Sequence, residues 1–166
     1  MLWLDRINGL VNRGLAWAAG LTLVGTMLFT VLDMVLRALG RPVAGSFEVI
    51  GWLSAAAMAL ALGYTQLHRG HVAIDLVVAR LEGRARHGVE TLTHFASLLL
   101  FCAVAAYVAQ YGNTLRESGS LSETLKAIVY PWVYVVALGA AGLALALLVD
   151  FLRALRGLLR RSRKAG

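Results

Sequence analysis

The stretch GLAWAAGLTLVGTMLFTVLDMVL, residues 14–36, decides the class of this protein, because Asp33 is its one charged residue. An α-helix of about 20 apolar residues crosses the roughly 30 Å of hydrocarbon in a bilayer. A surface helix of a soluble protein would instead carry polar residues along its outer face. The run is too long for the h-region of a signal peptide, and no A-x-A site closes it. We therefore predict an uncleaved transmembrane helix.

Three further stretches, residues 48–67, 90–112 and 127–152, repeat this apolar pattern. Hydrophobic residues make up 59% of the 166 residues and charged residues only 15%. A globule of this size could not bury four such segments on all sides. We therefore predict an all-α integral membrane protein, a single membrane domain with four transmembrane helices.

Two shorter stretches predict amphipathic helices that lie in the membrane interface. Residues 1–13, MLWLDRINGLVNR, can place Leu2, Ile7 and Leu10 on one face and their charges elsewhere. Residues 72–82, VAIDLVVARLE, are apolar but too few to cross a bilayer. Helices of this kind lie at the boundary between headgroups and acyl chains.

The basic residues predict the orientation, because cytoplasmic loops carry an excess of Lys and Arg. Twelve of the 16 lie on one side of the spans, in residues 1–13, 69–86 and 153–166. The two opposite loops contain the other four, Arg37, Arg41, Arg116 and Lys126. We therefore expect both termini in the cytoplasm. The basic tail, 153–166, suits anionic lipid headgroups, so nucleic acid is not needed to explain the net charge of +7.

Asp33 is the one carboxylate clearly inside a predicted span, where charges are costly and often functional. Arg37 lies four residues further on, a spacing at which two side chains meet on a helix. An ion or proton site is the alternative, but a proton relay usually needs a second buried acid. We therefore predict an intramembrane pair of Asp33 and Arg37. Glu48 opens the next span, where a carboxylate favours the helix dipole, and Arg37 and Arg41 are its candidate partners.

The histidines are candidate ligands of a metal or a haem. His68, His71 and Asp75 have a spacing that zinc ligands can adopt on a helix, but Gly70 interrupts the turn and no fourth ligand is evident. A haem needs histidines on different helices at one depth, and His94 finds only His68, at the end of a helix. The sequence contains no nucleotide-binding or catalytic motif. We expect no cofactor, no metal and no enzymatic activity.

Small residues predict close contacts between the spans. Ala55, Ala59 and Gly63 recur at a spacing of four in the second span, and the fourth span contains Gly139, Ala140 and Ala144. In lipid, such residues let two helix backbones approach closely.

The order of these features resembles the small membrane subunit of tripartite ATP-independent periplasmic (TRAP) transporters, the DctQ-like small permease. The resemblance rests on Arg37 after the first span, Glu48 and Gly63 in the second, RGHVAID at 69–75 with Arg69, Gly70, His71 and Asp75, and YPWVY at 130–134 with Pro131 and Trp132. We interpret residues 68–75 as a corner that fixes the angle between the second span and the interfacial helix.

This resemblance implies a function and partners. Such a subunit of the bacterial inner membrane accompanies a large permease of about a dozen spans, which carries the substrate and sodium sites. A periplasmic solute-binding protein delivers an organic acid. The small subunit is expected to act as a scaffold without binding substrate. Two alternatives are a haem-bearing or structural anchor of a respiratory enzyme and a stand-alone four-helix transporter, for which Asp33 lies too near the outer end.

Overall fold

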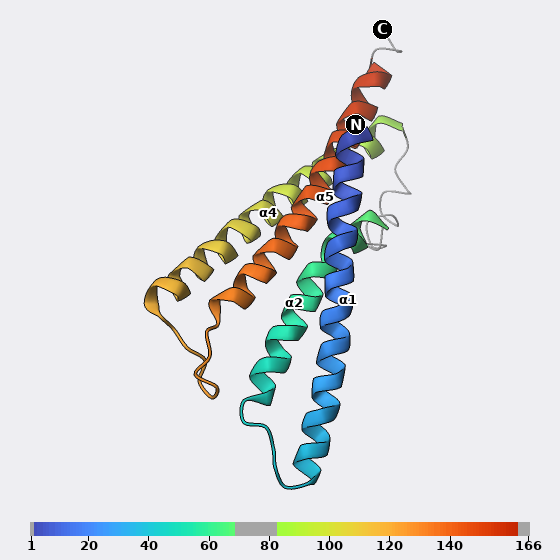
Figure 1. Cartoon of the computed structure of the whole chain (residues 1–166). Helices are drawn as coiled ribbons and strands as arrows, with labels where there is room; N and C mark the ends of the chain where they lie inside the picture. The colour runs from blue at the N-terminus through green and yellow to red at the C-terminus, as the bar shows by residue number, and fades with distance from the viewer. Residues whose placement is uncertain (1, 69–82, 163–166) are drawn as a thin grey trace.

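The computed structural model describes residues 2–68 and 83–162 of the chain (Figure 1). Its helices are α1 (Leu2–Ala38), α2 (Ser46–Leu67), α4 (Gly83–Ser118) and α5 (Tyr130–Ser162). Each contains a segment long and apolar enough to cross a membrane: Trp3–Ala38, Ser46–Leu67, Thr91–Ser118 and Tyr130–Arg156. The predicted all-α fold with four membrane-crossing helices is confirmed. The predicted interfacial helix at 72–82 lies outside the described residues.

Helix α1 is continuous from Leu2 to Ala38, with no break between the predicted interfacial segment 1–13 and the predicted span 14–36. Its 37 residues extend about 55 Å at 1.5 Å per residue, well beyond the hydrocarbon thickness. Three threonine hydroxyls inside it, Thr22, Thr26 and Thr30, each donate to the carbonyl four residues earlier. These hydroxyls therefore need no partner outside the helix.

The helices are arranged in the order α1, α2, α5, α4, with α2 and α5 in the middle (Figure 1). Within the described residues, α4 contacts α5 and no other helix. The connections 39–45 and 119–129 lie at one end of the bundle, which we call the hairpin end. Helix α1 begins and α5 ends at the opposite end, which we call the terminal end (Figure 1).

The core of the bundle is the seam where α2 and α5 run side by side. Gly139 of α5 lies against the backbone of Ala59 and Leu60, and a Cβ at position 139 would overlap those main-chain atoms. Small side chains from both helices are buried along this region: Ala56, Ala57, Ala59, Ala137, Ala140, Ala144 and Ala146. Two of the small residues predicted to pack, Ala59 and Gly139, therefore meet at the centre of the seam. Another, Ala55, is exposed.

The hairpin, residues 119–129, joins α4 to α5 and lies at the hairpin end. Leu121 and Ile128 form an antiparallel bridge, and the Ser122 amide donates to the Ala127 carbonyl at 2.9 Å. Lys126 adopts a left-handed backbone conformation at the turn, with φ of 51°. Pro131 follows in the first turn of α5, where its missing N–H removes no helix hydrogen bond.

Candidate functional site: polar clusters at both ends of the bundle

At the hairpin end, the buried Asp33 and its partner Arg37 connect α1 to the 39–45 loop and to α2. Its Oδ2 accepts a hydrogen bond from Arg37 Nη2 at 2.9 Å, and its Oδ1 accepts one from the Val43 amide at 3.3 Å. Arg37 also donates to Oγ of the buried Ser46 at 3.4 Å, and its guanidinium lies 5.5 Å from the centre of the Phe47 ring. The predicted partners Asp33 and Arg37 therefore lie together, and they hold the end of α1 to the start of α2.

Glu48, in the first turn of α2, connects this helix to the hairpin. Its two carboxylate oxygens accept hydrogen bonds from the amides of Thr124 at 2.8 Å and Leu125 at 3.2 Å. The Leu125 side chain packs on Gly45 so closely that no Cβ would fit there. Thus Glu48 contacts main-chain donors 76 and 77 residues away, whereas its candidate partner Arg37 is engaged by Asp33.

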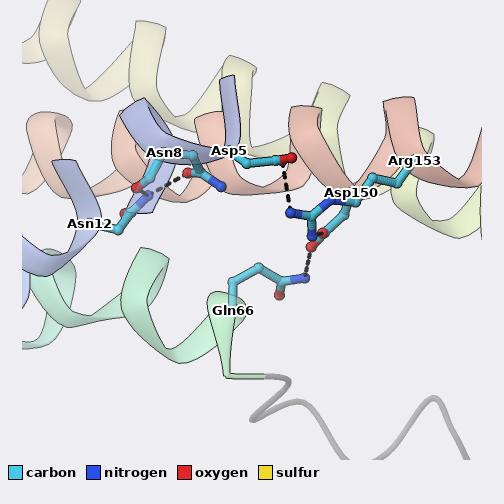
Figure 2. Close-up of polar contacts among 6 residues, drawn as sticks. All are labelled: Asp5, Asn8, Asn12, Gln66, Asp150 and Arg153. Carbon is cyan, nitrogen blue, oxygen red and sulfur yellow. Dashed lines mark hydrogen bonds and ion pairs between the residues drawn. The ribbon is translucent and has the colours of Figure 1, made fainter. Parts of the chain in front are cut away.

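At the terminal end, four side chains from three helices form a second cluster (Figure 2). Asp150 of α5 accepts a hydrogen bond from Gln66 Nε2 of α2 at 3.0 Å and one from Arg153 Nη1 at 3.2 Å. Arg153 also donates to Asp5 of α1 at 2.8 Å. Of these contacts, only that between Asp150 and Arg153 is local in the sequence, at a spacing of three. The sequence did not indicate that Asp5 and Gln66 belong to this cluster, because a single polar residue at a helix end is compatible with many roles.

Beside this cluster lie two buried asparagines of α1, Asn8 and Asn12 (Figure 2), and Asn12 explains why position 63 is a glycine. Asn12 Nδ2 donates to the Asn8 side chain at 2.7 Å and to the Asn8 carbonyl at 3.1 Å. Asn12 Oδ1 has no hydrogen-bond donor among the described residues. It occupies the space into which a Cβ at Gly63 would project, and Gly142 lies next to it. The Asn12 amide is therefore a wedge between α2 and α5.

Aromatic contacts join the helices at the hairpin end. Trp132 of α5 stacks on Trp52 of α2, with ring centres 6.0 Å apart. Tyr134 of α5 donates to Asn113 of α4 at 2.6 Å, and its ring packs on Gly112. Trp132, one of the residues on which the family resemblance rests, thus takes part in an interhelical contact.

Four of the predicted family-motif residues, Arg69, Gly70, His71 and Asp75, lie outside the described residues. The preceding residue, His68, follows the end of α2 at Leu67. Its Nδ1 lies 3.0 Å from the Tyr64 carbonyl oxygen, and its ring centre is 4.2 Å from that of Tyr64.

The polar groups are concentrated at the two ends and not along a path through the bundle. Among the buried side chains that the structure describes, only Thr26 is polar between the two end clusters, and it bonds within its own helix. In residues 2–68 and 83–162, no three His, Cys, Asp or Glu side chains gather in a way that could hold a metal ion. The hydrogen bonds and ion pairs of these polar groups therefore join one helix to another.

Residues 26–157 match the family described as "Tripartite ATP-independent periplasmic transporters, DctQ component". The chain belongs to the DctQ family. The match begins within α1 and ends within α5, so it includes Asp33, Glu48, Gly63 and Asp150 but excludes Asn8 and Asn12. The resemblance found in the sequence is confirmed, and the chain is a small membrane subunit of a tripartite transporter. No curated protein and no solved structure matches the chain.

Proposed function

We propose that this DctQ-family subunit is a rigid scaffold for the large permease of a TRAP transporter, without a substrate site of its own. The observation that carries this proposal is the pair of polar clusters, one at each end of the bundle. The contacts of Asp33, Arg37 and Glu48 join α1, α2 and the hairpin, and the Asp150 cluster joins α1, α2 and α5. Helices fixed at both ends do not slide easily past each other.

The middle of the bundle supports the same proposal. A helix pair that moves substrate needs space or exchangeable contacts, whereas the backbones of α2 and α5 touch at Gly139 and the Asn12 amide fills the space between Gly63 and Gly142. Packed interiors of this kind resist continuous deformation. The motion and the substrate site therefore belong to the large permease, which we expect to bind sodium and an organic acid delivered by a periplasmic binding protein.

We place the hairpin end on the periplasmic side of a bacterial inner membrane and both termini in the cytoplasm. The support is the distribution of Lys and Arg, since 12 of 16 flank the terminal end of the spans. A reporter that is active only in the periplasm should give signal when inserted between Gly119 and Ser120, and none when fused after Gly166. The reverse pattern would contradict this orientation.

Within this proposal, the family-motif residues have structural roles. Arg37, Glu48 and Trp132 hold the hairpin end together, Gly63 admits the Asn12 wedge, and Pro131 starts α5. For Arg69, Gly70, His71 and Asp75, we retain the proposal of a cytoplasmic corner against the large permease.

Co-purification and uptake together test the function. The tagged subunit, solubilised gently from its native host, should retain a larger membrane protein of about a dozen spans. Deleting the subunit should abolish sodium-dependent uptake of the organic acid, and a plasmid copy should restore it. Normal sodium-driven uptake in the deletion strain would refute the scaffold function. Retention of labelled substrate by the purified subunit alone would refute the absence of a substrate site.

A further inference from the structure

The face of α4 that points away from α5 exposes three side chains that can form hydrogen bonds. Tyr107, Gln110 and Tyr111 follow one another at helical spacing, so they share one side of the helix. All three are exposed, Tyr107 to 71% and Tyr111 to 58%. None of their side-chain polar groups has a hydrogen-bond partner within the part of the chain that the structure describes.

The contacts between α4 and α5 give the depth of this face in the membrane. The two helices are antiparallel, and Asn113 is level with Tyr134, as Phe95 is with Phe151. Gln110 is then level with about residue 137, seven residues inside the start of α5 at Tyr130. At 1.5 Å per residue this is roughly 10 Å. The distance along α5 from Tyr130 to Asp150 is about 30 Å, which equals the hydrocarbon thickness.

An amide or hydroxyl at this depth is costly if it has no hydrogen-bond partner, because lipid chains offer none. The outward face of α1 provides the contrast. Between Asn12 and Asp33, its exposed hydrogen-bonding side chains are limited to Arg13, next to Asn12, and Trp17, also near the terminal end. The rest of that exposed face consists of aliphatic residues, methionine, alanine and glycine. Lipid is a satisfactory neighbour for α1, whereas α4 needs a neighbour that can form hydrogen bonds.

We propose that α4 docks on the large permease through Tyr107, Gln110 and Tyr111, against a transmembrane helix that presents hydrogen-bonding side chains. This inference rests on the proposed scaffold function and adds the face that the scaffold uses. Ala103 and Ala106, each four residues before a member of the trio, are also exposed. Small residues there allow a second backbone to approach closely, as hydrogen bonds between membrane helices require.

Site-specific photocrosslinking in the intact transporter tests the face directly. A benzophenone amino acid at position 110 should crosslink to the large permease, whereas the same group at Val24, an exposed α1 position also deep in the hydrocarbon, should crosslink mainly to lipid. Crosslinks from position 110 only to lipid, or to a second copy of this chain, would overturn the inference. If they occurred while the large permease still co-purified, the scaffold function would stand. Failure of the large permease to co-purify with the wild-type chain would refute the scaffold function and the docking face with it.

Substitutions measure the contribution of the hydrogen bonds. Gln110→Leu should weaken retention of the large permease by roughly three- to tenfold, and Tyr107→Phe by less, in line with interhelical hydrogen bonds in membranes. Thr114→Val on the same helix is the control, because the Thr114 hydroxyl already donates to the Gln110 carbonyl, and it should have no effect. Tyr107 and Gln110 are both exposed on this face, so the subunit itself should fold normally. Unchanged retention by Gln110→Leu would overturn the inference.

Discussion

The α2–α5 seam and the two polar clusters hold the bundle together by different interactions. In the seam, glycine and alanine bring the backbones into van der Waals contact, and the fit leaves no space for an added methyl group at Gly139. At the ends, charged and amide side chains join the helices through hydrogen bonds and ion pairs, and one of them, Arg153, has a side chain that is 51% exposed.

This difference follows from where each region lies in the membrane. Lipid chains are as apolar as the helices, so association in the middle depends on close packing of surfaces. At the ends, water and headgroups lower the cost of keeping charged groups. We therefore expect substitutions in the seam to be more damaging than those in the clusters, and the following variants test this ranking.

The largest effect is expected for Gly139→Ala in the seam. The new methyl group would meet main-chain atoms of Ala59 and Leu60, which cannot rotate away, so the helices must separate. We expect a loss of about 3 kcal/mol or more, seen as a marked fall in the thermal unfolding temperature in detergent. Gly51→Ala is the control, because nothing lies within 4 Å of a Cβ there. If both variants unfolded at the wild-type temperature, the seam would not be the tightest region.

Gly63→Ala should be the next most damaging, and it should depend on Asn12. A Cβ at position 63 would overlap the Asn12 amide, at a cost of about 2 kcal/mol. In the Asn12→Ala background the same change should cost at least about 1 kcal/mol less, because the obstructing group is gone. Thermal unfolding of the two single variants and the double variant gives this coupling. Simple additivity would show that Asn12 is not the wedge.

Glu48→Gln should loosen the hairpin without unfolding the bundle. The neutral side chain can accept from the amides of Thr124 and Leu125 through only one oxygen, and more weakly than a carboxylate. Hydrogen exchange at these amides should become roughly three- to tenfold faster, while the seam amides stay protected. Glu123→Gln, in the same hairpin, is the matched control. Equal exchange in both variants would mean that Glu48 does not hold the hairpin.

The smallest effect is expected for Arg153→Gln at the terminal end. Its partner carboxylates are partly exposed, and ion pairs near water contribute about 0.5 kcal/mol. The wild-type advantage should shrink further at high salt, because salt screens exposed charges. Thermal unfolding at low and high ionic strength checks both points. A loss as large as that of Gly139→Ala would reverse the proposed ranking of seam and clusters.

Much of the architecture could be predicted because it depends on local sequence alone. Four apolar runs of sufficient length predicted four membrane-crossing helices, and the spacing of Asp33 and Arg37 is enough to place them together on one helix. The partners of Glu48 could not be predicted, since the two amides belong to a loop 76 and 77 residues away and every residue type except proline supplies such an amide. The cluster of Asp5, Gln66, Asp150 and Arg153 was missed for a similar reason, because its members come from three helices.

The sequence by itself determined the number of spans and the DctQ resemblance, because hydrophobic length and motif order do not depend on how the helices pack. Only the tertiary structure decided why Gly63 must be small. Spacing identified it as a packing residue, but the neighbour that excludes a side chain is Asn12 of another helix. The same holds for Gln110, which looks unremarkable in the sequence. Its significance comes from lying exposed at hydrocarbon depth on a helix that contacts α5 alone among the described helices.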